Sequence, residues 1–438
     1  MPPNGGASVG HQNYSRLTGF SNPGHSVPAP SKMSVFYLAF RCSWCIPHVG
    51  WLLNGIKGGG MKASSVNQVA AFDPPGCRQT SSLHLIQPVS EHISRFPSTR
   101  YYGSKRKLLG WMYGHLGPLR FDSALDAFGG TGSVSLLFQA MNKRVTYHDG
   151  FRFNEDVART VLAAKPALTR YEVEKFLAAV EPRSGVIARN FKDIFFKGEE
   201  NSWLDGFIST LDEKCKTLEI RSLLRFLIYQ ACLKKRPFNL FHRANLSLRT
   251  KEGVKRTFGN AVTWERSFSH HALQAYDELV RTSEAKRQPA VILPAGDASD
   301  IRPGYDLVYI DPPYINCEDR YNRDDYWRRY HFLEGLAVYD KWAGSIDLAS
   351  DIRLSKPSPW FAEWSRKKTF KDRLFTFIDS HRKSIVVLSY VSNAAPSEAE
   401  LLNYFESKFA QVSVHSAAHH HALSKTQKRE LLLIGIPK

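Results

Sequence analysis

Short apolar runs recur along the chain, and their order predicts an α/β protein. Runs typical of buried strands occur at residues 121–128, 144–149, 305–310, 384–390 and 430–436. The first run, FDSALDAF, leads through the glycine turn GGTG into the helix-like stretch SVSLLFQAMN, and the run RVTYHD follows directly. This order of strand, tight turn, helix and strand is typical of the opening unit of a doubly wound α/β sheet.

A long stretch with helical periodicity interrupts the strand-like runs. Residues from about 155 to 285 combine helices with charged loops, and RSLLRFLIYQACLKK is the clearest amphipathic helix. We therefore predict a mostly helical insertion at 161–285 in a sheet domain made of 96–160 and 286–438. Residues 1–95 are rich in Gly, Ser, Pro and Asn and show no sustained period of 2 or 3.6, which predicts a largely disordered N-terminal extension.

The chain carries a strong excess of positive charge. Lys and Arg exceed Asp and Glu by 18, and only seven of the 59 basic residues lie in residues 1–95. This charge suits a polyanion, with nucleic acid as the first candidate, or an anionic membrane surface. The uncharged run 42–56 is shorter than the ~18 apolar residues of a spanning helix. Six scattered cysteines suit a reducing compartment, so we expect a cytoplasmic protein. Neither the single C-x-x-C pair at 42–45 nor the histidine run at 419–421 predicts a metal site.

The glycine turn after the first strand is typical of a nucleotide-like cofactor site. Phe128, Gly130 and Gly132 form an F-x-G-x-G pattern, in which glycine lets the backbone approach a ligand closely. The pattern differs from G-x-G-x-x-G and no Walker lysine follows, which disfavours a dinucleotide or ATP. Asp149 ends the second strand, where an acid can accept hydrogen bonds from both ribose hydroxyls of an adenosine. Together they favour an adenosine-type cofactor; the alternative role of Asp149 is the N-cap of the next helix.

The tetrapeptide Asp311-Pro312-Pro313-Tyr314, here called the elbow, is the strongest candidate for the reaction site. It follows a strand, so we expect it at the carboxyl end of the sheet, where open α/β folds bind ligands. Prolines lack an N–H, which leaves main-chain carbonyls without a competing local donor. A carboxylate and a carbonyl beside a ring suit the exocyclic amine of a flipped-out base stacked on Tyr314. Hydrogen bonds from the amine to Asp311 and to the Pro312 carbonyl would free its lone pair to attack an activated methyl group.

With the glycine turn, Asp149 and the elbow in this order, the chain resembles the Dam-like, DPPY-type family of S-adenosylmethionine-dependent DNA adenine methyltransferases. The resemblance covers about 96–160 and 290–438. It implies S-adenosylmethionine as cofactor and a class I methyltransferase, or Rossmann-like, doubly wound fold. It also implies that the helical insertion is the DNA-recognition domain.

Two further segments extend the resemblance to cofactor contacts. RYYGSKRKLLGWM, residues 100–112, resembles the family's N-terminal motif, which implies contacts by Tyr101 and Lys105. AGDASD, residues 295–300, resembles the segment that meets the cofactor's adenine, which implies a contact by Asp297. The remaining implied cofactor residues are Phe128, Gly130, Gly132, Asp149 and Asp311.

The basic run KKRPFNLFHRANLSLR, residues 234–249, interleaves positive charges with aromatic rings. A surface that follows phosphates and stacks on bases has this composition. The predicted DNA contacts are Arg236, His242, Arg243 and Asn245. The alternative is the end of an amphipathic helix followed by a solvated basic loop.

The predicted reaction is methyl transfer from S-adenosylmethionine to N6 of adenine at specific sites in double-stranded DNA, by a chain that acts on DNA as a monomer. The same chemistry on N4 of cytosine is an alternative, because the elbow recognises an amine and not a particular ring. A non-catalytic nucleic-acid-binding protein on the same fold is a second alternative. The residues determine neither the recognition sequence nor whether a cognate restriction endonuclease is a partner.

Overall fold

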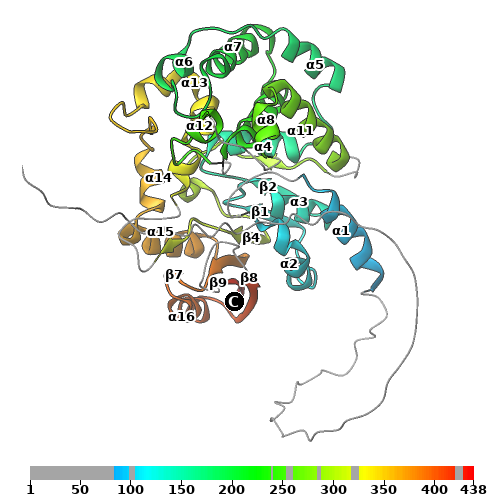
Figure 1. Ribbon diagram of the computed structural model, residues 1–438. Helices are drawn as coiled ribbons and strands as arrows, with labels where there is room; N and C mark the ends of the chain where they lie inside the picture. The colour runs from blue at the N-terminus through cyan, green and yellow to red at the C-terminus, as the bar shows by residue number, and fades with distance from the viewer. Residues whose placement is uncertain are drawn as a thin grey trace, which may run out of the picture. The chain divides into compact units, whose positions relative to one another are not determined.

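The computed structural model describes residues 83–97, 104–237, 240–252, 260–283, 288–316, 325–419 and 428–438 (Figure 1). Its central feature is a seven-stranded sheet with the order β3-β2-β1-β4-β6-β9-β8. The strands of this sheet are β1 (Ser123–Asp126), β2 (Arg144–Tyr147), β3 (Val291–Ile292), β4 (Leu307–Ile310), β6 (Ile385–Val391), β8 (Gln411–His419) and β9 (Lys428–Ile436). Two short strands, β5 (Ile315–Asn316) and β7 (Ala394–Ala395), form a separate antiparallel pair.

The sheet is mostly parallel, as the sequence predicts. β3, β2, β1, β4 and β6 pair in parallel, and their carboxyl ends therefore meet at one edge. β9 runs antiparallel to both of its neighbours, β6 and β8, so it begins at the edge where the parallel strands end. All five predicted strand runs form strands, whereas β8 and the two-residue β3 were not predicted.

Alternate residues of the strands face two different hydrophobic cores. Leu307 and Tyr309 of β4 belong to one core, and Val308 and Ile310 belong to the other. The first core is covered by α2 (Leu109–Leu116), α3 (Ser133–Ala140) and α4 (Arg152–Val161). The second is covered by α15 (Lys367–Ser380) and α16 (Glu398–Lys408), which Figure 1 shows on the side of the sheet away from the insertion. The sheet thus forms a middle layer with helices on both faces.

All elements that the structure describes between residues 170 and 283 are helices. They are α5 (Arg170–Ala178), α6 (Val186–Asn190), α7 (Gly198–Lys214), α8 (Leu218–Lys235), α9 (Ser247–Thr250), α10 (Asn260–Glu265) and α11 (Phe268–Ser283). Their apolar side chains continue the first core of the sheet. Ser222 and Tyr229 of α8 donate hydrogen bonds of 2.7 and 2.8 Å to the buried carboxylate of Asp156 in α4. The insertion is therefore packed on the sheet domain and shares its core.

The remaining elements surround the sheet. They are α1 (Leu83–Arg95), α12 (Tyr326–Ala337), α13 (Tyr339–Trp342) and α14 (Pro359–Trp364), with 3-10 turns η1 (Lys105–Leu108), η3 (Ala298–Asp300) and η4 (Ala343–Ser345). Tyr330, Phe332 and Leu336 of α12 are buried in the core. No helix in the described ranges is long and apolar enough to cross a membrane.

Helix α1 corrects the prediction of disorder for residues 1–95. Val89 and Phe96 are buried, and the main-chain carbonyl of Arg95 accepts a hydrogen bond of 2.9 Å from Thr282 in α11. Val89, Ile93 and Phe96 are spaced by four and three residues, a helical period that the polar composition of the preceding segment hides. The other residues of that prediction, 1–82, lie outside the described ranges.

Candidate active site

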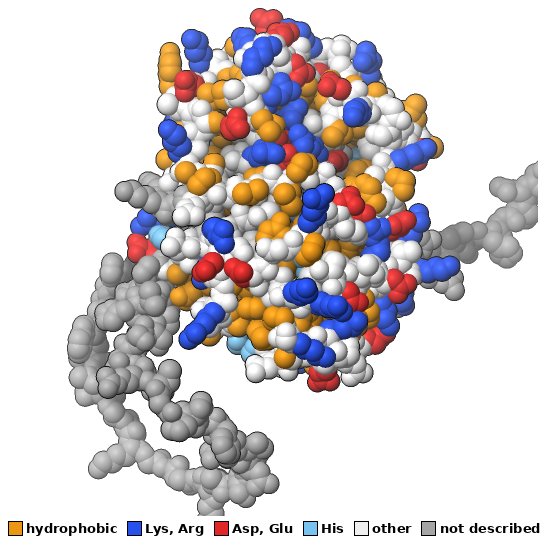
Figure 2. Space-filling model, turned by 180° about the vertical axis from the view of Figure 1, so that it is seen from behind, with side chains coloured by type: hydrophobic (Ala, Val, Ile, Leu, Met, Phe, Trp, Pro, Cys, Tyr) orange, Lys and Arg blue, Asp and Glu red, His pale blue; other side chains and the backbone are white. Residues whose placement is uncertain are grey.

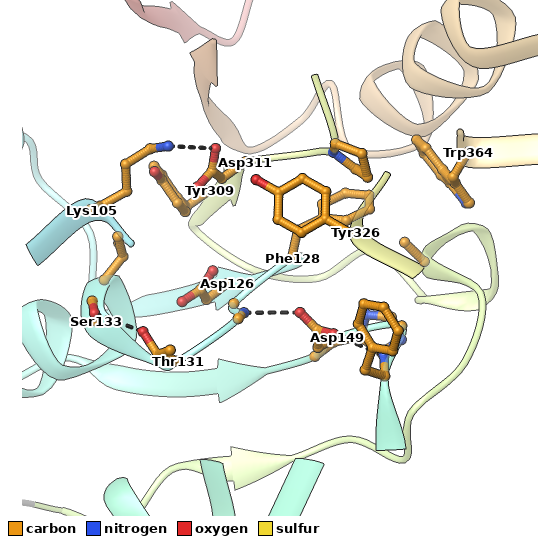
Figure 3. A pocket seen from close by; sticks show the side chains of 18 of the residues that line it. Lys105, Asp126, Phe128, Thr131, Ser133, Asp149, Tyr309, Asp311, Tyr326 and Trp364 are labelled. Carbon is orange, nitrogen blue, oxygen red and sulfur yellow. Dashed lines mark hydrogen bonds and ion pairs between the residues drawn. The ribbon is translucent and has the colours of Figure 1, made fainter. Parts of the chain in front are cut away.

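A deep cleft opens at the carboxyl ends of β1, β2 and β4, where the sequence predicts the ligand site (Figure 3). Its empty volume, counted out to open solvent, is about 820 Å³, within the range of small-molecule sites. Polar groups line one part of it, and aromatic side chains line the other. The polar lining includes Ser104, Lys105, Asp126, Thr131, Ser133, His148, Asp149 and Asp311. The aromatic lining includes Phe128, Phe151, Tyr309, Tyr326, Trp360, Phe361 and Trp364.

The glycine turn forms the floor of this cleft. A Cβ on Gly129 would lie 2.2 Å from Cε2 of Tyr147, so only glycine fits below that ring. The Tyr147 hydroxyl in turn donates a hydrogen bond of 2.6 Å to the Gly130 carbonyl. Gly130 and Gly132 have φ angles of 52° and 74°, in the left-handed region that favours glycine. Gly130 lines the cleft, while Gly132 lies at the start of α3 and is not part of the lining.

Asp149 is held at the cleft by three hydrogen bonds. Its Oδ2 accepts from the Gly130 N–H at 2.9 Å, and its Oδ1 accepts from the Phe151 N–H at 2.8 Å and from Asn154 Nδ2 at 2.9 Å. Burial raises the pKa of Asp149, and these hydrogen bonds oppose the rise. Phe151 occupies the N-cap position of α4, so the alternative prediction that Asp149 is the N-cap is wrong.

Asp126, at the end of β1, is a cleft carboxylate that the sequence analysis missed. Its Oδ2 accepts hydrogen bonds from the Ser135 N–H at 3.1 Å and from Ser135 Oγ at 2.6 Å. Burial raises the pKa of Asp126 to about 7, and the charges of Asp311 and Asp149 add to this effect. The signal in the sequence is its place: it is the last residue of the strand that enters the glycine turn.

The elbow brings its carboxylate into the cleft beside Lys105. Lys105 Nζ lies 2.9 Å from Asp311 Oδ1 and 2.6 Å from the Tyr314 hydroxyl, which itself donates to Asp311 Oδ1 at 2.8 Å. Glu430 of β9, a residue that the sequence analysis did not consider, completes the group at 3.1 Å from Lys105 Nζ. We call Lys105, Asp311, Tyr314 and Glu430 the elbow cluster. Segments more than 300 residues apart in the chain thus meet at one point.

Burial and oppositely charged neighbours act in opposite directions on the pKa values of Asp311 and Lys105. It raises the pKa of Asp311 to about 6; Lys105 opposes this rise and the charge of Glu430 adds to it. For Lys105, burial opposes the charged form, but Asp311 and Glu430 outweigh it and raise its pKa. Lys105 is therefore a cation at neutral pH, and Asp311 can serve as a hydrogen-bond acceptor above about pH 6.

The other two elbow residues named in the prediction do not line the cleft. Asp311 and Pro313 line it, whereas Pro312 and Tyr314 do not belong to the lining. The ring of Tyr314 packs edge-on against Tyr390 at 5.3 Å between centroids, and its hydroxyl belongs to the elbow cluster. Stacking of a base on Tyr314 and hydrogen bonding to the Pro312 carbonyl stay predictions.

Asp297 lies beside the cleft, and its neighbours Gly296 and Ala298 line it. Its carboxylate accepts a hydrogen bond of 2.8 Å from Trp364 Nε1 and forms an ion pair with Arg373. Burial opposes the charged form of Asp297, but these contacts outweigh burial and lower its pKa. The predicted cofactor contact at Tyr101 lies outside the described residues.

The aromatic wall of the cleft is the main feature that the sequence analysis missed. Trp360 and Trp364 come from α14, and Tyr326 begins α12. Phe128, at the start of the glycine turn, meets Trp364 edge-on at 5.0 Å between centroids. A Cβ on Gly150 would lie 3.3 Å from the Trp360 ring, so the wall packs tightly against the loop after Asp149. The only signal was the local density of rings in PWFAEW, residues 359–364, which does not show where they pack.

The structure separates the four predicted DNA contacts into two groups. Arg236 is fully buried and donates hydrogen bonds to the main-chain carbonyls of Leu240 at 3.0 Å and Arg243 at 2.7 Å. Its guanidinium also lies 4.4 Å from the ring centroid of Phe195. Asn245 is buried and donates to the Pro237 carbonyl at 3.1 Å. These two side chains hold the loop together, which corrects the prediction that they contact DNA.

Arg243 and His242 have more exposed positions. Arg243 is exposed, and His242 is half-buried. Burial lowers the pKa of His242 to about 4, and the charges of Arg329, Arg243 and other arginines add to this effect. The Phe241 N–H donates a hydrogen bond of 3.0 Å to the Arg329 carbonyl, which ties this loop to α12 behind the elbow. The contact of either side chain with DNA stays a prediction.

Two comparisons with known proteins agree with this geometry. The model of the D12 class N6 adenine-specific DNA methyltransferase family matches residues 101–341. The Type II methyltransferase M2.HphI of Haemophilus parahaemolyticus is 26% identical to the chain over 237 residues, which is 52% of this chain and 68% of that protein. The residues matched by the family model, 101–341, contain the glycine turn, Asp149, the insertion and the elbow.

Proposed function

The chain belongs to the D12 class N6 adenine-specific DNA methyltransferase family, and we propose that its cleft binds S-adenosylmethionine beside a target adenine held by Asp311. The enzyme transfers a methyl group to N6 of adenine in DNA. In the strand order, β9 runs antiparallel to both of its neighbours and lies beside the outermost strand, β8. This arrangement supports the finer assignment to the class I, Rossmann-like methyltransferase fold. The observation that carries the proposal is the meeting of the glycine turn, Asp149 and the elbow in one cleft.

The cleft lining fits the donor in charge and in shape. Asp149 suits the ribose hydroxyls, and Asp126, whose Oδ1 is buried without a hydrogen-bond partner among the described residues, suits an ammonium group. The aromatic wall offers ring faces and edges against which an adenine ring can pack. S-adenosylmethionine supplies an electrophilic methyl group on a sulfonium.

Asp311 has one carboxylate oxygen to offer to the target amine. In the part of the chain that the structure describes, its hydrogen bonds and its ion pair all involve Oδ1. Oδ2 can therefore accept a hydrogen bond from N6 of adenine, and the Pro312 carbonyl can accept the second. Both bonds would favour a tetrahedral nitrogen whose lone pair could attack the methyl group. The bond between that methyl group and the sulfonium would break as the N–C bond forms, S-adenosylhomocysteine would leave, and the amine would lose one proton to Asp311, its hydrogen-bond acceptor.

The insertion and α12 supply the contacts to double-stranded DNA. Figure 2 shows Lys and Arg side chains over much of one face, interspersed with Asp and Glu, so net charge alone does not define the DNA surface. The arginines around His242 are a more specific feature: Arg243 comes from the insertion, and Arg328 and Arg329 come from α12, which follows the elbow. We assign phosphate contacts to this group, with Arg243 as the most exposed representative. The similarity to a type II methyltransferase supports pairing with a cognate restriction endonuclease.

Calorimetric titration with S-adenosylmethionine tests the donor assignment. Asp149→Asn weakens the acceptor for the ribose hydroxyls, so we expect the Kd to rise about 10-fold or more. The matched control is Asp340→Asn, an exposed residue outside the cleft, for which the Kd stays unchanged. Equal affinity of both variants would contradict the assigned role of Asp149. Failure of the wild-type protein to bind the donor would contradict the proposed site.

A further inference from the structure

Glu430 reaches the reaction site from a strand that runs against the others. It is the third residue of β9, and it pairs with Val391 at the end of β6. Because β9 is antiparallel, its beginning lies at the same edge as the carboxyl ends of the parallel strands. Glu430 is buried, with 4% of its surface exposed, although it is a charged residue in a run of Leu and Ile. A buried carboxylate in such a run requires polar partners, and it has three.

All three partners of Glu430 meet the same oxygen. Oε1 accepts a hydrogen bond of 2.9 Å from Ser389 Oγ, and it lies 2.8 Å from the Tyr314 hydroxyl and 3.1 Å from Lys105 Nζ. Ser389 belongs to β6, so the carboxylate is anchored to the neighbouring strand. The position of Glu430 is therefore fixed by the sheet as well as by its contacts with the elbow.

The hydrogen-bond capacity of the elbow cluster explains what Glu430 does there. An ammonium has three donors, and Lys105 directs them to Asp311, Tyr314 and Glu430. A phenol has one donor, and the Tyr314 hydroxyl lies 2.8 Å from both Asp311 Oδ1 and Glu430 Oε1, so the two carboxylates share that donor. Without Glu430, one donor of Lys105 is unsatisfied, and the ammonium can swing to Oδ2 of Asp311. That oxygen is the one assigned to the target amine.

We propose that Glu430 is a positioning residue for methyl transfer, which holds Lys105 and Tyr314 on Oδ1 of Asp311 so that Oδ2 stays free for the amine. This inference rests on the proposed role of Asp311. Glu430 itself touches neither substrate. Its effect is on the geometry and charge of the residue that does.

A purely structural role predicts a different outcome. Breaking a buried ion pair lowers the free energy of unfolding whatever the cluster does in the reaction. A positioning role also changes the ionisation of Asp311, which is faced by Lys105 from η1, Tyr314 from the elbow, Tyr309 from β4, Asp126 from β1 and Glu430 from β9. Since the charge of Glu430 raises the pKa of Asp311, its removal lowers that pKa. A shift of the acid limb together with a lower kcat therefore shows that Glu430 acts on Asp311 in the reaction, which a role in stability alone does not predict.

The deciding experiment compares Glu430→Gln with Glu398→Gln in the full chain. Glu398 is a matched control because 37% of its side chain is exposed and, among the described residues, its ion pair is with Arg429, 3.2 Å away on the same strand as Glu430. We expect Glu430→Gln to lower kcat about 100-fold at pH 8, to leave the KM for DNA nearly unchanged and to shift the acid limb of kcat to lower pH. Glu398→Gln matches the wild type in all three. A kcat within about twofold of the control, or an unmoved acid limb, would overturn the proposal.

Two further variants keep the test decisive. If Glu430→Gln does not fold by thermal melting, Ser389→Ala removes the hydroxyl that anchors Glu430 and that also faces Tyr309, and we expect kcat to fall about fivefold. An unchanged kcat in Ser389→Ala would overturn the proposal. Asp311→Asn separates the two hypotheses: if it stays active, the proposed site is wrong; if it is inactive while Glu430→Gln is normal, only the role of Glu430 is wrong.

Discussion

The edge of the sheet and the helical insertion differ in how their predicted residues are arranged. At the edge, Lys105, Asp149 and Asp311 come from segments up to 206 residues apart, yet all three line one cleft. In the insertion, Arg236 and Arg243 are only seven residues apart, but one is fully buried and the other exposed. Closeness in sequence was therefore a poor guide to shared function. Position at the end of a parallel strand was a good one, because the strand direction alone places that residue at the ligand edge.

The role assigned to the sheet edge is tested by removing the carboxylate of Asp311. Asp311→Asn keeps the shape of the side chain but replaces the carboxylate that accepts a hydrogen bond from the amine. We therefore expect the rate of methyl transfer to fall about 1000-fold. Donor and DNA affinities change far less than the rate, because most of the contacts assigned to them involve other residues. Single-turnover transfer of labelled methyl groups measures the first, and equilibrium titrations measure the others. Retention of a tenth of the wild-type rate would contradict the assignment.

The buried half of the insertion is tested by Arg236→Met. Methionine fills much of the space but leaves the carbonyls of Leu240 and Arg243 without their donor. We expect the free energy of unfolding to fall by about 3 kcal/mol. Urea denaturation measures this, while the salt dependence of DNA binding of the folded variant stays that of the wild type. A weaker salt dependence of DNA binding with an unchanged free energy of unfolding would support the original prediction that Arg236 contacts DNA.

The pH dependence of kcat sharpens the account of the edge. Protonation of Asp311 removes an acceptor for the amine, and its pKa is raised from 3.8 to about 6. Activity is therefore present above this pKa and falls as the pH drops through it, about tenfold for each unit. A profile of kcat at saturating donor and DNA measures this limb. Asp126, whose pKa is raised to about 7, is the other candidate, and the limb should persist in Asp126→Asn.

The smallest effect is expected for the exposed half of the insertion. Arg243→Ala removes one phosphate contact, so the slope of log affinity against log salt falls by about one, and the affinity falls a few-fold at low salt. Arg120→Ala is the control: Arg120 is exposed, but it precedes β1 and so lies at the opposite edge of the sheet. Fluorescence anisotropy at several salt concentrations measures both slopes. Identical slopes for the two variants would remove Arg243 from the DNA surface.

Local features of the sequence were sufficient to predict the strands and turns that form the cleft. Short apolar runs predicted five strands, the glycines at 129, 130 and 132 predicted the turn, and the elbow was expected directly after a strand, which is β4. Each of these properties depends on near neighbours, through side-chain periodicity or through the φ angles that glycine and proline permit. The sheet edge followed from them, because parallel strands end together.

Only the tertiary structure decided which other side chains join that frame. Glu430 is 325 residues from Lys105, and nothing near it in sequence shows that β9 runs antiparallel and begins at the cleft. The tryptophans of α14 and the burial of Arg236 also depend on which helix packs against which surface. The sequence by itself therefore predicted where the cleft lies, and long-range packing determined how the charges there are held, because contacts between distant segments leave no local pattern.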